Sequence, residues 1–220
     1  MLDNPVKLNP DFAHSLMIGS GLFWTITYLL ILRRGFKDKN YGMPVAALCA
    51  NLSWEFIFSF VYPHPAPQLY INYTWLLFDV GILIQYFYYG RNGFPGNLPK
   101  ALFYPWFVLT LVLSALTIML MSKEFNEYIG IYAAFGQNLL MSVLFISMLL
   151  KRGSSTGQSL YIGLSKMLGT ILPSVLFYNY FPQSYLLQLL YISIFIYDLA
   201  YVILLYNKLK AEGINPWKRL

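Results

Sequence analysis

Residues 101–121 read ALFYPWFVLTLVLSALTIMLM, which is 21 consecutive positions without a charged side chain. About 20 apolar residues in a helix cross the ~30 Å hydrocarbon core of a lipid bilayer. The stretch therefore predicts a membrane-spanning helix, and similar runs recur on both sides of it.

We count seven such runs, each bounded by charged or turn-forming residues. They cover residues 14–32, 44–62, 72–89, 101–121, 128–150, 159–178 and 185–206. The short connections predict that consecutive helices are antiparallel neighbours. The expected fold is an all-α, seven-transmembrane-helix bundle that forms a single polytopic membrane domain over residues 1–220.

The composition excludes other classes of protein. Of the 220 residues 58% are hydrophobic and only 11% are charged, whereas a soluble domain carries about 25% charged residues. Disorder requires low hydrophobicity, which this chain does not have. A single cysteine, Cys49, excludes a disulfide framework and a cysteine-based metal site.

The lysines and arginines predict the orientation. Twelve of the 15 lie in the first, third and fifth connections and the C-terminal tail, whereas only Lys7 and Lys123 lie on the opposite side. Lys166 falls inside a span. The positive-inside rule then places the N-terminus outside and the C-terminus in the cytosol. Because this distribution accounts for the net charge of +6, no nucleic-acid partner is expected.

Similar features recur about 118 residues apart. Residues 30–35 (LILRRG) resemble residues 148–153 (MLLKRG), and Asp79 and Asp198 lie 119 positions apart. These repeats suggest two parallel three-helix units joined by the fourth helix, an arrangement that transporters also use.

Four ionisable residues fall deep inside the predicted spans: Glu55, Asp79, Lys166 and Asp198. A charge near the bilayer centre costs roughly 2.5–3.5 kcal/mol, so each needs a structural or functional reason. The helical rise places all four roughly 11–17 Å from the cytosolic helix ends, which predicts one shared polar pocket. Lys166 alone cannot neutralise three acids, so at least one carboxyl group stays protonated near neutral pH. Glu55 is the best candidate for that proton donor, although structural pairing of Lys166 with Asp198 or Asp79 remains open.

Polar and aromatic neighbours support the pocket. Asn51 lies one turn before Glu55, and Gln137 and Asn138 lie in the middle of the fifth span. Aromatic residues number 41, and rings around a cavity can stabilise a cation. The amides could instead join helices, and many rings could only pack. The aromatic residues expected at the pocket are Trp54, Phe58 and Tyr197.

Motifs for metal or cofactor chemistry are absent from the sequence. It contains no adjacent Asp-Asp pair, no helix with two metal-spaced histidines and no glycine-rich phosphate loop. We therefore expect acid–base chemistry inside the membrane that needs neither a metal nor a cofactor.

Three segments carry a resemblance: NLSWEF at 51–56, FGQN at 135–138 with Met141-Ser142, and RGSSTGQS at 152–159. They resemble the integral-membrane terpene cyclases of meroterpenoid and indole-diterpene biosynthesis, the paspaline-type and pyripyropene-type enzymes and their bacterial relatives. The resemblance implies an isomerase or lyase that protonates the terminal alkene or epoxide of a prenyl chain attached to an acceptor. It also implies that Glu55 and Asp198 are the essential acids.

The same resemblance implies a farnesylated or geranylgeranylated substrate, with a pathway prenyltransferase and an epoxidase as functional partners. It implies a multi-pass protein of the endoplasmic reticulum or the bacterial inner membrane. Two other readings of the sequence remain open. One is a small seven-helix transporter with parallel three-helix repeats, and the other is a structural subunit whose charges only pair helices.

Overall fold

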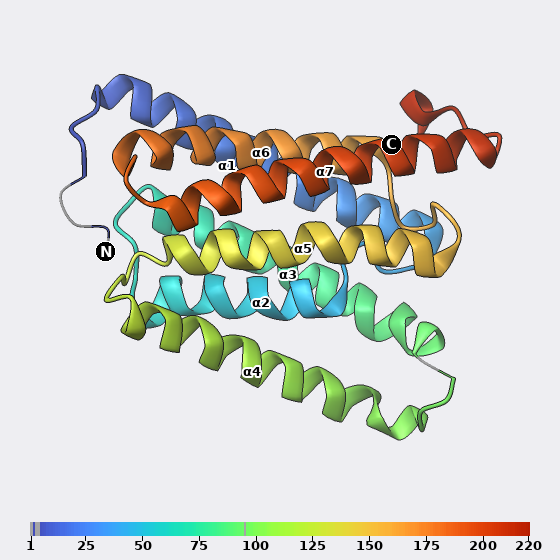
Figure 1. Ribbon diagram of the computed structural model, residues 1–220. Helices are drawn as coiled ribbons and strands as arrows, with labels where there is room; N and C mark the ends of the chain where they lie inside the picture. Colours follow the sequence, from blue (N-terminus) through green and yellow to red (C-terminus); the bar gives the residue numbers. More distant parts are fainter. Residues whose placement is uncertain (1, 3–4, 95) are drawn as a thin grey trace.

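The computed structural model describes residues 2, 5–94 and 96–220, and these residues form helices and connections without a strand (Figure 1). Residues 1, 3, 4 and 95 of the expected 1–220 unit lie outside the described residues. The α-helices are α1 (Pro10–Asp38), α2 (Val45–Phe56), α3 (Gln68–Tyr89), α4 (Phe103–Glu124), α5 (Ile131–Arg152), α6 (Leu160–Tyr180) and α7 (Tyr185–Ala211). A π-helical turn, η1 (Ile57–Val61), follows α2, and short 3-10 turns are η2 (Gly90–Gly93), η3 (Lys100–Leu102) and η4 (Pro216–Lys218).

All seven predicted helices are present, and the prediction of an all-helical fold is confirmed. The first helix is longer than predicted because it has a strong start signal. The side chain of Asn9 accepts hydrogen bonds from the backbone N–H groups of Asp11 and Phe12, and Pro10 occupies the first helical position. At the other end α1 continues past Arg33 and Arg34 to Asp38.

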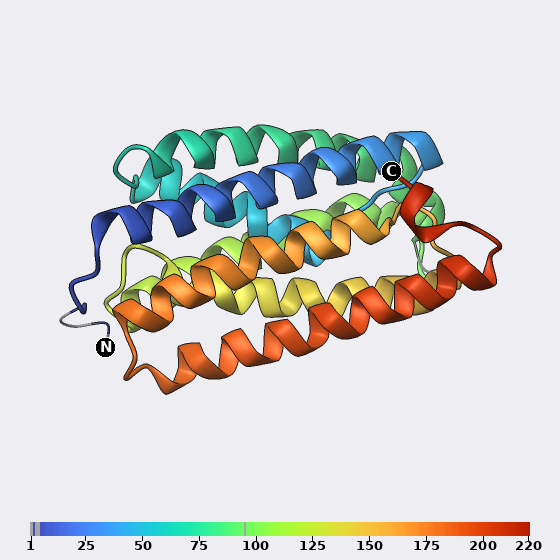
Figure 2. The same cartoon turned by 90° about the horizontal axis from the view of Figure 1, so that it is seen from above.

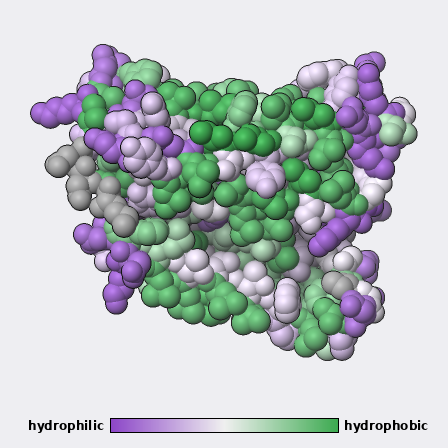
Figure 3. Space-filling view, viewed as in Figure 1, coloured by the Kyte–Doolittle hydropathy of each residue, from purple (hydrophilic) through white to green (hydrophobic). Residues whose placement is uncertain are grey.

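Within the described residues, five helical segments are long and apolar enough to cross a membrane, which makes the chain a multi-pass membrane protein. They are α1, α4 with its preceding turn, α5, α6 and α7. The segment of α2 and η1 is shorter, and α3 buries the polar side chains of Asn72, Asp79 and Gln85. Figure 3 shows a broad hydrophobic band between two hydrophilic ends of the molecule, as expected for a protein that crosses a bilayer.

The helices lie side by side along a common axis, but their neighbours are not simply the next ones in the chain (Figures 1 and 2). The expectation that consecutive helices pack together is wrong for α1, which packs against α6 and α3, and for α5, which packs against α7 and α2. Six helices thereby form a ring in the order α1, α3, α2, α5, α7, α6. The fourth helix lies outside this ring and packs mainly against α2.

The ring contains two units with the same internal packing. In the first, α3 contacts both α1 and α2; in the second, α7 contacts both α5 and α6. The units meet through α1 with α6 and through α2 with α5. This pattern agrees with the two three-helix units expected from the sequence.

A hydrogen-bond network closes the end of the bundle that carries most of the basic residues. The carboxylate of Asp38 accepts hydrogen bonds from Arg34, from Arg219 at 2.9 Å and from the backbone N–H of Gly157 at 2.8 Å. Arg152 donates to the backbone oxygens of Tyr41 and Thr156. The segment 152–159 thus ties the end of α1 to the C-terminal tail.

Candidate active site

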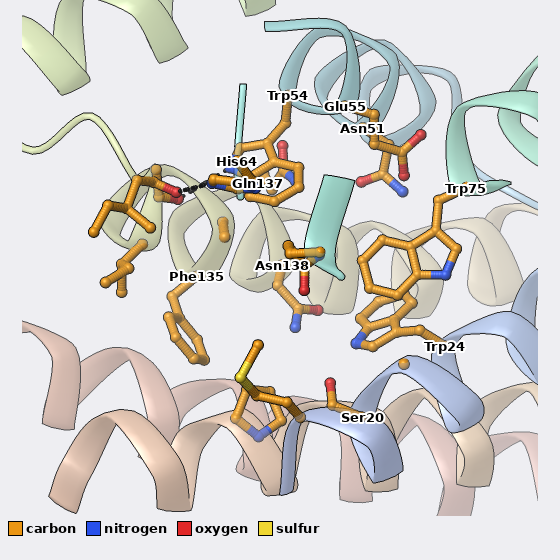
Figure 4. A pocket seen from close by; sticks show the side chains of 18 of the residues that line it. Ser20, Trp24, Asn51, Trp54, Glu55, His64, Trp75, Phe135, Gln137 and Asn138 are labelled. Atoms are coloured by element: carbon orange, nitrogen blue, oxygen red, sulfur yellow. Dashed lines mark hydrogen bonds between the residues drawn. The ribbon is translucent and has the colours of Figure 1, made fainter. Parts of the chain in front are cut away.

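A cavity of about 300 Å³ lies inside the ring of six helices (Figure 4). Helices α1, α2, α3, α5 and α6 line it, together with the connections that precede α3 and α5. The residues that line it and enter the argument below are Ser20, Trp24, Tyr28, Asn51, Trp54, Glu55, His64, Trp75, Phe135, Gln137, Asn138 and Pro173. Two of the three segments that carry the family resemblance, 51–56 and 135–142, therefore contribute to this cavity.

The cavity reaches one end of the bundle and not the other. Its lining runs from Glu55 and Asn51 within α2 to Pro65, Gln68 and Gly130 in or beside the connections at the N-terminal end of the molecule. The opposite end is occupied by the Asp38 network.

Glu55 is buried in the wall of the cavity and belongs to a short hydrogen-bond chain. The hydroxyl of Tyr28 on α1 donates to Oε1 of Glu55 at 2.6 Å. Nδ2 of Asn51 donates to the same tyrosine oxygen at 2.8 Å. Asn51 and Glu55 share a face because they are one turn apart on α2. Tyr28 did not enter the sequence prediction.

Asp79 on α3 lies next to Glu55, so that the two carboxyl groups adjoin. Asp79 is fully buried. Among the described residues, no donor reaches either oxygen of Asp79 or Oε2 of Glu55 within hydrogen-bond geometry. Asp79 lies behind Glu55 and is not in the cavity wall.

The other two deep charges neutralise each other. Nζ of Lys166 lies 2.7 Å from Oδ1 and 3.0 Å from Oδ2 of Asp198, and it also donates to Oγ of Ser142 at 2.7 Å. The pair is almost fully buried. Of the two partners that the sequence left open for Lys166, the structure has Asp198.

The expected single polar pocket is therefore divided in two. Neither Lys166 nor Asp198 lines the cavity that contains Glu55. Asp198 instead borders a second cavity of about 370 Å³ between α6 and α7, together with Thr170, Ser174 and Tyr191. One cluster of buried ionisable residues belongs to each three-helix unit: Glu55 with Asp79 in the first, and Lys166 with Asp198 in the second.

The two amides of α5 line the main cavity as expected. Nδ2 of Asn138 donates to Oγ1 of Thr170 at 2.8 Å, and that hydroxyl in turn donates to the backbone oxygen of Lys166 at 3.0 Å. Because the hydrogen of Thr170 is used in this way, its oxygen must accept from Asn138, which fixes the orientation of the amide. The side-chain oxygens of Gln137 and Asn138 accept no hydrogen bond from the described residues.

Aromatic rings cover much of the remaining wall. Trp54, as expected, lines the cavity, and Trp24, Trp75 and Phe135 join it (Figure 4). Phe58 is not a lining residue: its ring packs behind Trp54 with a centroid separation of 4.9 Å.

Tyr197 is also misplaced by the sequence prediction, because it does not line the cavity and its side chain is 41% exposed on the outside of α7. The sequence of α7 does not reveal which face is internal, since apolar residues surround this helix on all sides.

Ser20 and Pro173 meet at the contact between α1 and α6. Proline has no backbone N–H, so Pro173 leaves the carbonyl of Gly169 without its helical partner. The hydroxyl of Ser20 donates to that carbonyl at 2.8 Å. A side chain of the first three-helix unit thus supplies the hydrogen bond that a backbone carbonyl of the second unit lacks.

His64 forms the wall near the end of the cavity. Nδ2 of Asn72 lies 3.0 Å from Nδ1, and Nε2 lies 2.9 Å from the backbone oxygen of Ile129. An amide nitrogen can only donate, so Nδ1 accepts and Nε2 carries the hydrogen. Burial lowers the pKa of His64, although its hydrogen bond to the Ile129 carbonyl opposes that effect. The ring is a neutral part of the wall.

Residues that could hold a metal ion do not come together in the described ranges: no group of three or more histidine, cysteine, aspartate or glutamate residues is found there. The polar side chains that line the cavity include one carboxyl group, one phenol, one serine hydroxyl, one imidazole and four amides, the last from Asn51, Gln68, Gln137 and Asn138.

Comparison with known proteins shows which family the sequence matches. A model of the Pyr4-like transmembrane terpene cyclases matches residues 5–210. The Pyr4-family terpene cyclase mfmH of Annulohypoxylon moriforme is 30% identical over 188 residues, which cover 83% of this chain and 78% of that protein.

Other similar proteins are also fungal. The terpene cyclase pyr4 of Aspergillus fumigatus is 26% identical over 77% of this chain and 73% of its own length. The asnovolin H synthase nvfL of Aspergillus novofumigatus is 29% identical over 74% of this chain and 69% of its own length. No solved structure shows a significant match.

Proposed function

The chain belongs to the Pyr4-like transmembrane terpene cyclases, and we propose that Glu55 starts its reaction by protonating a prenyl chain held in the main cavity. The protein is a membrane-embedded terpene cyclase, and its substrate is a prenylated molecule. The transporter alternative raised by the sequence is not supported, because the family and the similar proteins are cyclases.

The observation that carries the assignment of Glu55 is its position in the cavity wall beside a second carboxyl group and apart from the buried cation. Two adjoining carboxyl groups in a low-dielectric interior cannot both be ionised, so the pair keeps at least one proton. Lys166 is already satisfied by Asp198 and Ser142. A neutral carboxylic acid is therefore available next to the cavity, which is the requirement for a general acid.

The proposed step is a proton transfer from Glu55. The O–H bond of the carboxyl group breaks, and the proton bonds to an epoxide oxygen or to a terminal alkene carbon. In the epoxide the C–O bond then opens and its electron pair goes to the oxygen, whereas in the alkene the π electron pair forms the new C–H bond. Either event leaves a carbocation, which successive double bonds attack. Loss of a proton, or capture by an internal nucleophile, ends the cascade.

Aromatic walls and the exclusion of water suit this reaction. Trp24, Trp54 and Trp75 present ring faces or edges to the cavity, and a desolvated cation beside a ring gains roughly 2 kcal/mol. The helices around Glu55 separate this part of the cavity from the aqueous phases and so limit quenching of the cation by water. An apolar prenyl chain also partitions into the bilayer, from which it can reach a cavity at this depth.

We assign a positioning role to Asp198, in place of direct protonation. Asp198 forms an ion pair with Lys166, which donates a hydrogen bond to Ser142. The hydroxyl of Ser142 in turn donates to the backbone oxygen of the cavity residue Asn138. Loss of Asp198 would leave a buried ammonium group unpaired and would disturb this wall.

The proposal extends to the membrane and the pathway. We place all seven α-helices across the bilayer as one domain, with the N-terminus outside and the C-terminus in the cytosol, in the endoplasmic reticulum or a bacterial inner membrane. The lysine and arginine distribution supports this orientation. A prenyltransferase supplies the farnesylated or geranylgeranylated acceptor, and an epoxidase supplies its terminal epoxide.

The test of the substrate class uses membranes that contain the full chain. They receive farnesylated and geranylgeranylated phenols, each with and without a terminal epoxide, and the products are separated and identified by mass spectrometry and NMR. We expect ring-containing isomers of at least one substrate, which membranes without the protein do not produce. Recovery of every substrate unchanged, at full protein accumulation, would contradict the proposed substrate class.

A further inference from the structure

We infer that Tyr28 is a positioning residue for Glu55, which confines the transferable proton to Oε2 and stabilises the carboxylate left after proton transfer. The inference rests on the proposed role of Glu55 as the acid. It concerns a residue on α1, outside the three segments that carry the family resemblance.

The hydrogen-bond directions follow from the chemistry of the three groups. An amide nitrogen has no acceptor capacity, so Asn51 must donate to the oxygen of Tyr28, at 2.8 Å. The single hydroxyl hydrogen of Tyr28 is then directed to Oε1 of Glu55, at 2.6 Å. All three side chains are buried, with exposed fractions of 4% or less.

This arrangement determines which oxygen of Glu55 carries the proton. A protonated carboxyl group has one hydroxyl oxygen and one carbonyl oxygen, and the carbonyl oxygen is the better acceptor. Since Oε1 accepts from Tyr28, the acidic proton resides on Oε2. No other donor among the described residues reaches Oε2, and the adjoining carboxyl group of Asp79 is the group that can share this proton.

The same bond assists the proton transfer. Before transfer Tyr28 donates to a neutral carbonyl oxygen, and after transfer it donates to a carboxylate. Hydrogen bonds to charged groups are stronger than neutral ones by roughly 1.4 kcal/mol, which corresponds to about a tenfold rate difference. Asn51 strengthens the effect because a hydroxyl that accepts a hydrogen bond becomes a better donor.

A purely structural role is the competing explanation. Helices α1 and α2 are not major packing partners, so the bond between Tyr28 and Glu55 could serve only to connect them. The experiment therefore needs a readout that a structural connection would not change.

The test compares Tyr28→Phe with Tyr201→Phe in membranes that are supplied with the prenylated substrate that the parent protein cyclises. Tyr201 is the matched control, because it is equally buried and its hydroxyl bonds Gln158 at 3.1 Å, near the basic end of the bundle. We measure protein accumulation, kcat, KM and the infrared C=O stretch of protonated Glu55, which the spectrum of Glu55→Gln identifies by its loss.

We expect Tyr28→Phe to lower kcat roughly tenfold with little change in KM, and to move the Glu55 band to higher frequency because its carbonyl oxygen loses a donor. Tyr201→Phe should leave kcat and the band unchanged. Parental kcat in Tyr28→Phe, or an unshifted band, would overturn the inference.

A second variant covers the case in which Tyr28→Phe does not accumulate. Asn51→Leu removes the donor to Tyr28 but keeps the bond between Tyr28 and Glu55. We therefore expect a smaller upward shift of the same band, and an unchanged band would overturn the inference. The two proposals fail differently. Parental turnover by Glu55→Gln would defeat the acid assignment itself, whereas an inactive Glu55→Gln beside a fully active Tyr28→Phe would defeat only the role of Tyr28.

Discussion

Nζ of Lys166 lies 2.7 Å from Oδ1 of Asp198, and this buried ion pair leaves Glu55 and Asp79 without the cation. The separation of the two clusters explains how one bundle can hold a charged pair and a protonated acid at similar depth. In the Lys166–Asp198 pair the two charges compensate each other, and the Glu55–Asp79 pair keeps a proton.

Removal of Lys166 should destabilise the protein through Asp198 specifically. We expect Lys166→Met to cost roughly 3–5 kcal/mol, because it leaves a buried carboxylate unpaired. Accumulation in the membrane and the melting temperature in detergent measure the loss. The double variant Lys166→Met/Asp198→Leu should recover most of it, whereas Lys166→Met/Asp79→Leu should not. Equal rescue by both would show that the ion pair is not the source of the loss.

Asp79 should affect Glu55 through its hydrogen-bonding chemistry. In Asp79→Asn an amide donor lies beside Oε2 of Glu55 and favours the carboxylate, so we expect kcat to fall about tenfold or more at unchanged KM. Asp79→Leu has a similar volume but no donor, so Glu55 stays protonated and the variant keeps more activity than Asp79→Asn. The kcat values of the two variants test this prediction. A higher kcat for Asp79→Asn than for Asp79→Leu would contradict the interaction between the two carboxyl groups.

His64 should make stability depend on pH. Burial lowers its pKa in the folded protein below the ordinary value of about 6.5. Below that value the unfolded chain binds a proton that the folded chain does not, so stability is fully present above about pH 6.5 and falls as the pH drops towards the folded pKa. The melting temperature of the parent should therefore fall between pH 7.5 and 5.5 by more than that of His64→Gln. His14→Gln, at an exposed position, is the control and should behave as the parent; a parental pH dependence in His64→Gln would refute the assignment.

The proposed orientation can be read from single cysteines in a Cys49→Ala background. We expect Lys37→Cys and Lys151→Cys to react with an impermeant maleimide only from the cytosolic side, and Ala66→Cys and Glu124→Cys only from the other side. All four positions are exposed. Labelling of Lys37→Cys and Ala66→Cys from the same side would contradict the seven-span arrangement.

The sequence predicted the helices well because long apolar runs have few alternatives in a bilayer. It predicted their neighbours poorly, since hydropathy does not say that α1 packs against α6 and not α2. That packing is what separates Asp198 from the cavity and places Tyr197 on the outside.

The sequence does not predict Tyr28 as a partner of Glu55, because the first apolar run predicts a helix that ends near residue 32. A helix of that length places Tyr28 about 6 Å from the cytosolic end, where an interfacial tyrosine needs no explanation. The actual helix continues to Asp38, which places the hydroxyl-bearing residue about 15 Å deep, level with Glu55. The six further residues of α1, 33–38, are therefore what brings Tyr28 to the depth of Glu55.

The central claim is that Glu55 supplies the proton, and the most direct measurement is the turnover of Glu55→Gln against that of the parent on the same prenylated substrate. Glutamine keeps the shape and an acceptor for Tyr28 but has no acidic proton. We expect kcat to fall by at least the ~10²–10⁴-fold typical of general acid catalysis, with substrate binding retained because the apolar walls are unchanged. Asp11→Asn, in the exposed first turn of α1, should match the parent. Cyclisation by Glu55→Gln at the parental rate would contradict the account.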